Sequence, residues 1–485
     1  MLLLALHTLI VLGFGSRVLL RNNLSPDVRM GWLMVIVVLP YAGAVLYWLL
    51  GEVDIGHRVL GRRKRFEDFI TSRLPDDPVA MQLLGRPADV AAQIAPAWQA
   101  AFRYATSVNG FLPVPGNQAE LMDDGAVARA RMLADMDAAR REINVLYYIW
   151  LDDDTGQGIA EALMRAARRG VTCRAMVDGL GSRAFLRSAR WRAMRDAGIQ
   201  LAVALPIDHL AKVLLTSRLD LRNHRKITLI DGAITYCGSQ NCADEAFRVK
   251  ARYAPWVDIM LRLQGPVVTQ MQLLFASDWM QSTGEEYDPF TPAPAAAAEP
   301  HGGGFPALVV ADGPTERPRA TPHLVSTLIA SAQRELLVST PYFVPDATVL
   351  EALCAAAWRG VQVTLVLPQR NDSWIVAAAS RSTYYQLLRA GVAIAEYRGG
   401  LLHAKTLCVD GEVAMLGSTN LDLRSFDLNF ENNVLLQDRA TTAAIRQRQL
   451  AYLAQSQPVT LAEVRQWPWP RRMWNNLMAT LGPVL

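Results

Sequence analysis

The sequence predicts an α/β protein made of two similar lobes in one chain, preceded by a hairpin of two membrane-spanning helices. Three observations predict this architecture: two long apolar segments near the N-terminus, a repeated pattern of strands and helices in the remainder, and a segment rich in Pro, Ala and Gly between the two copies. A chain of 485 residues is also too long for one ordinary domain, so two lobes are expected.

The N-terminal hairpin is predicted from apolar residues alone. Residues 31–50 include no charged residue, and about twenty residues at ~1.5 Å per residue cross a hydrocarbon core of ~30 Å. Pro40 lies within this segment and is tolerated in membrane helices. Residues 2–20 are also apolar except for His7 and Arg17. No basic stretch precedes them and no A-x-A site follows, so a retained helix is expected there rather than a cleaved signal peptide.

A basic segment follows the hairpin. Its members are His57, Arg58, Arg62, Arg63, Lys64 and Arg65. Because basic residues concentrate on the cytoplasmic side of membrane proteins, the lobes are expected in the cytoplasm. The same residues suit either a topology anchor alone or a contact with anionic lipid headgroups.

The remainder of the chain contains an internal repeat. The tripeptides REI at 141–143 and REL at 334–336 each open an apolar strand pattern, and the helical patterns that follow stop at Gly170 and Gly360. Strands alternating with helices predict lobes with a largely parallel sheet. Two like lobes predict a pseudo-dimer within the chain, with a shared site at the interface between the lobes. The expected boundaries are a membrane hairpin at 1–52, a basic juxtamembrane and connecting region at 53–120, the first lobe at 121–287, a linker at 288–305, and the second lobe with a C-terminal interfacial segment at 306–485.

The most specific match between the copies is a long motif that occurs once in each. The first copy reads HRKITLIDGAITYCGSQN from residue 224, and the second reads HAKTLCVDGEVAMLGSTN from residue 403. An apolar run that ends in Asp-Gly and resumes predicts a β-hairpin. Because residues two apart on a strand face the same side, each His is expected to project together with the Lys that follows it. The two pairs are His224 with Lys226 and His403 with Lys405.

The aspartates of the motif, Asp231 and Asp410, lie at an odd offset from these pairs. Strand periodicity therefore places them in the turns of the hairpins, where they would form the turn rather than take part in catalysis.

Two His-Lys pairs that face each other would suit chemistry at a phosphodiester. One imidazole can attack phosphorus while the other protonates the departing alcohol. The lysines, with the hydrogen-bonding residues that end each motif, would neutralise the phosphate, so no metal or other cofactor is required. Those residues are Ser239, Asn241, Ser418 and Asn420. A single H-x-K is usually a solvated surface pair, but its duplication within a repeat favours a functional site.

The duplicated H-x-K-x4-D motif, followed by G-S-x-N, resembles the phospholipase D superfamily and, within it, the bacterial cardiolipin synthases. The resemblance covers nearly the whole chain and includes the segments YYIW, TPYFVPD and RSFDLNFE. It implies phospholipase D-like α/β/α lobes and a multi-pass protein of the bacterial inner membrane. It also implies a reaction in which two phosphatidylglycerol molecules give cardiolipin and glycerol. The implied partners are phosphatidylglycerol and other anionic membrane lipids, and phosphatidylethanolamine would fit the same chemistry as donor.

The resemblance also implies a role for each motif residue. His224 would attack the first lipid and become a phosphatidyl-histidine, and His403 would protonate the leaving glycerol and then deprotonate the second lipid. The phosphate would be held by Lys226, Lys405, Asn241 and Asn420. Because Asp231 and Asp410 belong to the family motif, they count as candidate catalytic residues despite their expected place in turns.

Each copy has a carboxylate downstream of its motif: Asp258 in PWVD and Glu431 in LNFE. A histidine that transfers protons needs its other ring nitrogen fixed. We therefore expect Asp258 to orient His224 and Glu431 to orient His403. The alternative is that both are ordinary carboxylates at a strand edge.

Other functions fit the sequence less well. Hydrolysis, as in a phospholipase D, would use the same site with water in the second step, and the motifs do not decide between the two. A phosphodiesterase or nuclease is disfavoured by the net charge of +4 and by the lack of interleaved aromatic and basic residues, so no nucleic acid is expected. Two intact motifs disfavour a non-catalytic scaffold. Residues 124–129 fit the D-G-x-x-A-R opening of a metal-dependent phosphatidyltransferase signature, but its later residues are absent, and a capped helix start is expected instead.

Three smaller features of the sequence also lead to predictions. The five cysteines form no C-x-x-C pair and are expected to be reduced core residues. Residues 201–221 are extra in the first copy and suggest an amphipathic segment for lipid entry. The C-terminal WPWPRRMW at 467–474 suits either an interfacial anchor or packing on the second lobe.

Overall fold

The computed structural model describes residues 2–22, 24, 26–51, 93–206, 220–289, 304–317 and 319–480, with isolated positions between 61 and 90. Most of the basic cluster, of the linker and of the extra segment of the first copy therefore lies outside the described residues. Arg62 is described, and it donates hydrogen bonds to the carbonyls of Gln281 (2.8 Å) and Ser282 (3.0 Å), so one member of the cluster binds the first lobe.

The N-terminal segment forms three helices where two were expected. They are α1 (Leu2–Leu19), α2 (Pro26–Val38) and α3 (Pro40–Leu50). The expectation of one helix over 31–50 is wrong because Pro40 has no N–H and its ring restricts the residue before it. Leu39 accordingly has φ −128° and ψ 65°, outside the helical region.

The three helices pack on one another around a small core of Val18, Trp32, Ile36 and Tyr47. Their outer surface is apolar, with large hydrophobic side chains exposed on all three helices. Among the residues that the structure describes, no helix combines the length and the apolar character needed to cross a bilayer, so the transmembrane hairpin is not supported.

The two lobes share one sixteen-stranded sheet, whose order is β20-β14-β13-β11-β16-β17-β19-β10-β1-β9-β7-β6-β2-β3-β4, with β5 paired to β19. The strands of the first lobe are β1 (Val114–Leu121), β2 (Glu142–Tyr147), β3 (Thr172–Asp178), β4 (Gln200–Ala204), β5 (Arg222–Asn223), β6 (Lys226–Ile230), β7 (Ile234–Gly238), β8 (Trp256–Val257) and β9 (Met260–Gln264). Those of the second lobe are β10 (Phe305–Asp312), β11 (Glu335–Ser339), β12 (Phe343–Val344), β13 (Gln362–Pro368), β14 (Ala393–Tyr397), β15 (Leu401–Leu402), β16 (Thr406–Val409), β17 (Val413–Gly417), β18 (Leu421–Asp422), β19 (Asn429–Gln437) and β20 (Ser456–Val459).

The strand order confirms the internal repeat. Reading outward from the central β1–β10 pair, the order β9-β7-β6-β2-β3-β4 matches β19-β17-β16-β11-β13-β14 strand for strand. The sheet is mixed rather than largely parallel: β2-β3-β4, β11-β13-β14 and the short β5–β19 pair run parallel, and its other described pairs are antiparallel. The first lobe's sheet also begins at Val114 in β1, before the expected boundary at 121.

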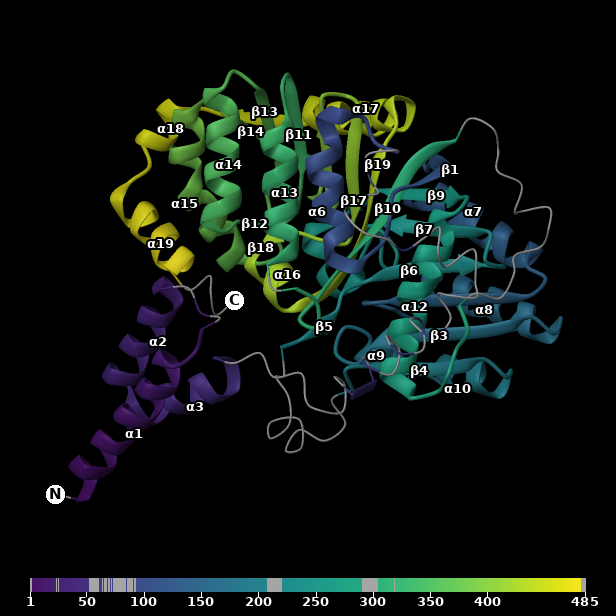
Figure 1. Ribbon diagram of the computed structural model, residues 1–485, viewed down its shortest axis with the longest axis horizontal. Helices are drawn as coiled ribbons and strands as arrows, with labels where there is room; N and C mark the ends of the chain where they lie inside the picture. Colours follow the sequence, from purple (N-terminus) through teal and green to yellow (C-terminus); the bar gives the residue numbers. More distant parts are fainter. Residues whose placement is uncertain are drawn as a thin grey trace.

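Helices cover both faces of the sheet, as Figure 1 shows. The first lobe has α7 (Gly125–Ala138), α8 (Asp154–Arg168), α9 (Arg183–Leu186), α10 (Ala189–Asp196), the short 3₁₀ helix η3 (Arg248–Tyr253) and α12 (Val267–Thr283). The second lobe is covered by α6 (Gln99–Asn109), α13 (Ala320–Ser331), α14 (Ala347–Trp358), α15 (Trp374–Ala390), α16 (Leu423–Asp427), α17 (Arg439–Ala454), α18 (Leu461–Arg465) and α19 (Trp469–Thr480). One core, which includes α12 and α17, joins strands of both lobes, and each lobe has a second core of its own.

The two motifs form the predicted hairpins, β6–β7 and β16–β17. Asp231 (φ 54°) and Asp410 (φ 52°) lie in their turns, each followed by a glycine with positive φ. The Asp231 carboxylate accepts hydrogen bonds from the backbone N–H groups of residues 140–142, and Asp410 accepts from those of residues 333–335. Asp231 therefore ties its hairpin to the start of β2, and Asp410 ties its hairpin to the start of β11, each at the far end of β6 or β16 from the histidine.

Two local predictions are also confirmed. Asp124 caps α7 by accepting a hydrogen bond from the backbone of Val127 (2.8 Å), as expected for a helix start. All five cysteines are free and buried.

Candidate active site

The two His-x-Lys segments meet where the lobes meet, because each enters its hairpin from a two-residue strand that pairs with a strand of the other lobe. β5 pairs with the start of β19 in the second lobe, and the backbone N–H of His224 donates to the Phe430 carbonyl (2.9 Å). β15 pairs with β8 in the first lobe, and the N–H of His403 donates to the Val257 carbonyl (2.8 Å). Each histidine therefore lies beside the carboxylate of the opposite lobe.

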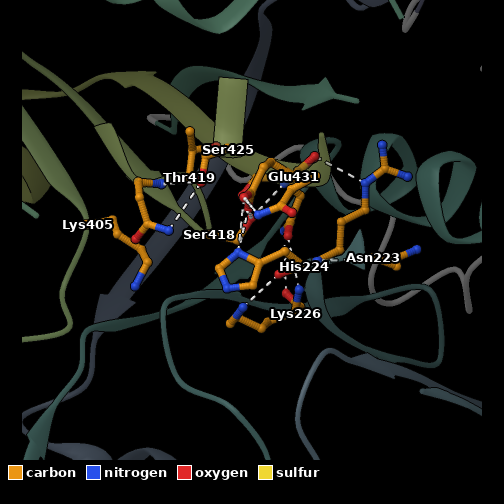
Figure 2. Close-up of polar contacts among 12 residues, drawn as sticks. Asn223, His224, Lys226, Lys405, Ser418, Thr419, Ser425 and Glu431 are labelled. Atoms are coloured by element: carbon orange, nitrogen blue, oxygen red, sulfur yellow. Dashed lines mark hydrogen bonds and ion pairs between the residues drawn. The ribbon is translucent and has the colours of Figure 1, made fainter. Parts of the chain in front are cut away.

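The histidine–carboxylate pairs accordingly cross between the lobes. His224 Nδ1 lies 3.0 and 2.9 Å from the two carboxylate oxygens of Glu431, and Figure 2 shows the imidazole pointing toward this group. His403 Nδ1 lies 2.5 Å from Asp258 Oδ1. The expected pairing within each lobe was wrong, because it took no account of the two crossing strands.

The serines of the motifs contact these carboxylates. Ser418 Oγ donates to Glu431 (2.5 Å), and Ser239 Oγ donates to Asp258 (2.5 Å). Each carboxylate thus lies between a serine of its own lobe and a histidine of the other. Glu431 also accepts a hydrogen bond from Asn429 Nδ2 (3.1 Å). The serines are fully buried and hold the carboxylates in place, and their contact with phosphate stays a prediction.

The lysines of both pairs are buried beside their histidines. Lys226 Nζ donates to the His224 carbonyl (2.6 Å), and Lys405 Nζ donates to the His403 carbonyl (2.7 Å). Burial lowers the pKa of Lys226 to about 8 and that of Lys405 to about 7. Each ammonium has three N–H groups, so two remain for a ligand after this one bond.

The asparagines that end the motifs lie in different surroundings. Asn420 uses its amide nitrogen on Ser425 Oγ (3.1 Å), and its side-chain oxygen is buried without a hydrogen-bond partner. Asn241 accepts a hydrogen bond from the backbone of Ile149 (3.3 Å). The contact of both asparagines with phosphate therefore stays a prediction.

Burial lowers the pKa of the histidines, and neighbouring positive groups lower that of the carboxylates. Burial lowers the pKa of His224 to about 4 and also lowers that of His403. Burial alone would raise the pKa of Asp258, but His403 and Lys405 lower it to about 2, and His224 and Lys226 likewise keep the pKa of Glu431 below its usual value. Near neutral pH, the His224 imidazole is therefore neutral: it donates its Nδ1–H to the ionised Glu431 carboxylate and keeps a lone pair on Nε2.

Three contacts of the site were not predicted from the sequence. The Tyr148 ring lies 4.9 Å from the His224 ring, and the Trp256 ring lies 4.6 Å from the His403 ring. Arg225, between His224 and Lys226, is buried, pairs with Asp278 (2.5 Å) and donates to the Glu431 carbonyl (3.1 Å). The one available signal was the difference between HRK and HAK, since the second motif has Ala404 at this position.

Comparison with known proteins matches nearly the whole chain. A family model described as "Cardiolipin synthase, PLD-like domain" matches residues 132–279 and 325–451, and one described as "Phospholipase_D-nuclease N-terminal" matches 9–52. Cardiolipin synthase A of Cronobacter sakazakii is 36% identical over 485 residues, covering 99% of this chain and 97% of the relative. Cardiolipin synthase A of Shigella boydii is 35% identical over 484 residues, with the same coverage. The crystal structure of phosphatidylserine synthase from Haemophilus influenzae has a TM-score of 0.58 at 14% identity, covers 79% of this chain and 100% of that one, and supports the fold.

Proposed function

Because the chain belongs to the cardiolipin synthases of the phospholipase D superfamily and is thus a phosphatidyltransferase, we propose how its two histidines divide the reaction. A phosphatidyl group passes from one phosphatidylglycerol to a second, giving cardiolipin and glycerol. The observation that carries this proposal is the pair of buried imidazoles, each held at Nδ1 by an ionised carboxylate of the opposite lobe, beside two buried lysines.

In the first step, His224 Nε2 attacks the phosphorus of the donor lipid. A P–N bond forms, the bond from phosphorus to the glycerol headgroup oxygen breaks, and the Nε2 proton of His403 passes to that oxygen. The low pKa of His224 supports its role as the nucleophile, because an imidazole must be neutral to attack.

Two features support His403 as the acid. Asp258 lies 2.5 Å from its Nδ1 and would stabilise the imidazolium, and the face of Trp256 lies close enough for a cation–π contact. His224 has no tryptophan in this place, since the position that corresponds to Trp256, two residues before the carboxylate, is Asn429.

In the second step, His403 removes the proton of a primary hydroxyl on the second phosphatidylglycerol. That oxygen attacks phosphorus, the P–N bond breaks, and His224 is neutral again, while His403 regains the proton for the next cycle. The free N–H groups of Lys226 and Lys405 would bind the phosphate oxygens in both steps, in a buried site where such contacts are strong.

Membrane association would bring the two lipids to this site. The apolar outer surfaces of α1–α3 support a location at the bacterial inner membrane, with these helices in the bilayer and the lobes in the cytoplasm.

A lipid assay tests the proposed function. The wild-type protein and His224→Ala would receive labelled phosphatidylglycerol in mixed micelles, with products separated by mass. Cardiolipin and free glycerol from the wild type alone are expected. Phosphatidic acid without cardiolipin would instead show that water takes the second step, and the transfer reaction would be withdrawn.

A further inference from the structure

The C-terminal helix α19 carries both packed and exposed tryptophans. Trp474 stacks on Trp374 of α15, with ring centroids 5.5 Å apart and planes inclined by 17°. Trp467, just before α19, lies 6.1 Å from the ring of Tyr384. Trp469, in contrast, is 71% exposed. One part of this segment therefore packs on the second lobe, as one of the two predicted roles requires, and another part faces outward.

A cavity of about 370 Å³ lies where α15 and α19 of the second lobe meet η3 of the first. Four arginines and the stacked tryptophans line it, and we call it the arginine cavity. These residues are Arg252, Arg370, Arg381, Arg471, Trp374 and Trp474. No carboxylate is among the residues that the structure places around it.

The positive charge of the arginine cavity is only partly neutralised. Arg381 Nε lies 3.5 Å from Glu396, which is the single ion pair that a lining arginine makes in the described part of the chain. Asp372, near the cavity, is already paired with Lys250 (2.5 Å). An anion that bridged the remaining guanidinium groups would gain charge-assisted hydrogen bonds from several of them.

A buried amide gives a second, independent indication of a ligand. Asn475 of α19 lines the arginine cavity and is 4% exposed, and its Nδ2 has no hydrogen-bond partner. Buried donors are nearly always paired, so an unpaired one in a cavity wall marks a place for an acceptor atom.

We propose that the arginine cavity binds the phosphate of an anionic membrane phospholipid, while the exposed apolar side chains of α19 contact the same bilayer. Trp469, Met473 (60% exposed) and Leu477 (52% exposed) provide those contacts, and a mixture of tryptophan and arginine is typical of the membrane interface. The cavity is separate from the histidines, but η3 leads into β8, whose Trp256 packs on His403. A lipid bound in the arginine cavity therefore holds the interface between the two lobes at the membrane surface.

Hydrogen–deuterium exchange on the full chain tests this proposal without turnover. The protein would carry His403→Ala, in detergent micelles with phosphatidylglycerol, with phosphatidylcholine or with inorganic phosphate. We expect phosphatidylglycerol alone to slow exchange in residues 469–480. The double variant Arg252→Gln/Arg471→Gln should lose this slowing. The single variant Arg252→Gln should weaken the slowing in the same way. It should have little effect on folding, because the Arg252 side chain is exposed.

The matched control is Arg168→Gln/Arg389→Gln, which removes the same charge at exposed positions, one of them at the opposite end of α15. It should keep the slowing caused by phosphatidylglycerol. Equal slowing by phosphatidylcholine, or slowing that survives in the cavity variants, would overturn the proposal. Slowing by inorganic phosphate alone would also overturn it, since the cavity would then be a site for free anions. None of these outcomes depends on the transfer reaction, which the lipid assay tests separately.

Discussion

The His224 and His403 half-sites have the same plan but differ at three matching positions. In both, a two-residue strand crosses to the other lobe, so that a serine and a histidine from different lobes share one carboxylate. The carboxylate is Glu431 for His224 and Asp258 for His403. The residue two positions before it is Asn429 in one half-site and Trp256 in the other.

The third difference lies between the histidine and the lysine. Arg225 in the first motif forms a buried ion pair with Asp278, whereas the second motif has the small Ala404. The His224 imidazole therefore lies in a dense polar network beside the ring of Tyr148, whereas the His403 imidazole lies against the larger ring of Trp256. We infer that the two repeated lobes give both histidines the same geometry. The residues at these three positions then make His224 a neutral nucleophile and allow His403 to carry a proton.

The largest expected effect comes from the two carboxylates, one per half-site. Glu431→Gln and Asp258→Asn keep the shape but remove the charge that fixes each imidazole. Each should lower kcat by up to about 10⁴-fold, as when a catalytic histidine loses its acidic partner. With a lipid whose leaving group needs no protonation, only Glu431→Gln should still slow formation of the covalent intermediate. The reverse result would mean that the histidines do not pair across the lobes.

The next effect concerns Arg225, which exists in one half-site only. Arg225→Met should lower the free energy of unfolding by about 3–5 kcal/mol, because Asp278 is left buried and unpaired. Arg225→Met/Asp278→Leu should recover most of the loss. Urea unfolding followed by circular dichroism measures both. A single variant as stable as the wild type would show that this ion pair does not hold the half-site together.

The pH dependence should show both half-sites at once. His224 must be neutral, so the rate should rise as pH increases through about 4, and the lysines must be charged, so it should fall through about 7 to 8. With a lipid whose leaving group needs no protonation, the pH profile of kcat/KM should report the ionisation of the lysines without that of His403. If the rate with this lipid did not fall at alkaline pH, the proposal that charged lysines bind the phosphate would be contradicted.

The smallest effect is expected for Trp256. Trp256→Leu removes the aromatic face beside His403, a contact worth about 0.5–2 kcal/mol, so kcat with phosphatidylglycerol should fall by about 2- to 30-fold. A lipid with an activated leaving group should react at the wild-type rate. Equal losses with both lipids would mean that the ring supports folding and has no part in proton transfer.

The sequence predicted those features that depend on neighbouring residues. The hairpins, their Asp-Gly turns and the placement of each histidine with its lysine follow from strand periodicity, and the repeat itself predicted two matching lobes. The pairing of the carboxylates could not be predicted, because it depends on β5 and β15, each only two residues long and paired far along the chain. With two symmetric copies, pairing within and between lobes looked the same.

Other differences have similarly physical causes. Composition showed that residues 31–50 are apolar, but the break at Leu39 comes from the backbone restriction that Pro40 imposes. The sequence shows that the motif serines can donate hydrogen bonds, but not to which group. Only the fold shows that they donate to the carboxylates.

The most direct test of the division of labour is to locate the covalent intermediate. His403→Ala and, separately, His224→Ala would react with a phosphatidyl ester of p-nitrophenol, whose leaving group needs no acid, followed by rapid quenching and mass spectrometry of peptides. The account predicts a phosphatidyl group on His224 in the His403→Ala protein and no adduct in the His224→Ala protein. An adduct on His403 in the His224→Ala protein would contradict it, because the half-sites would then be interchangeable.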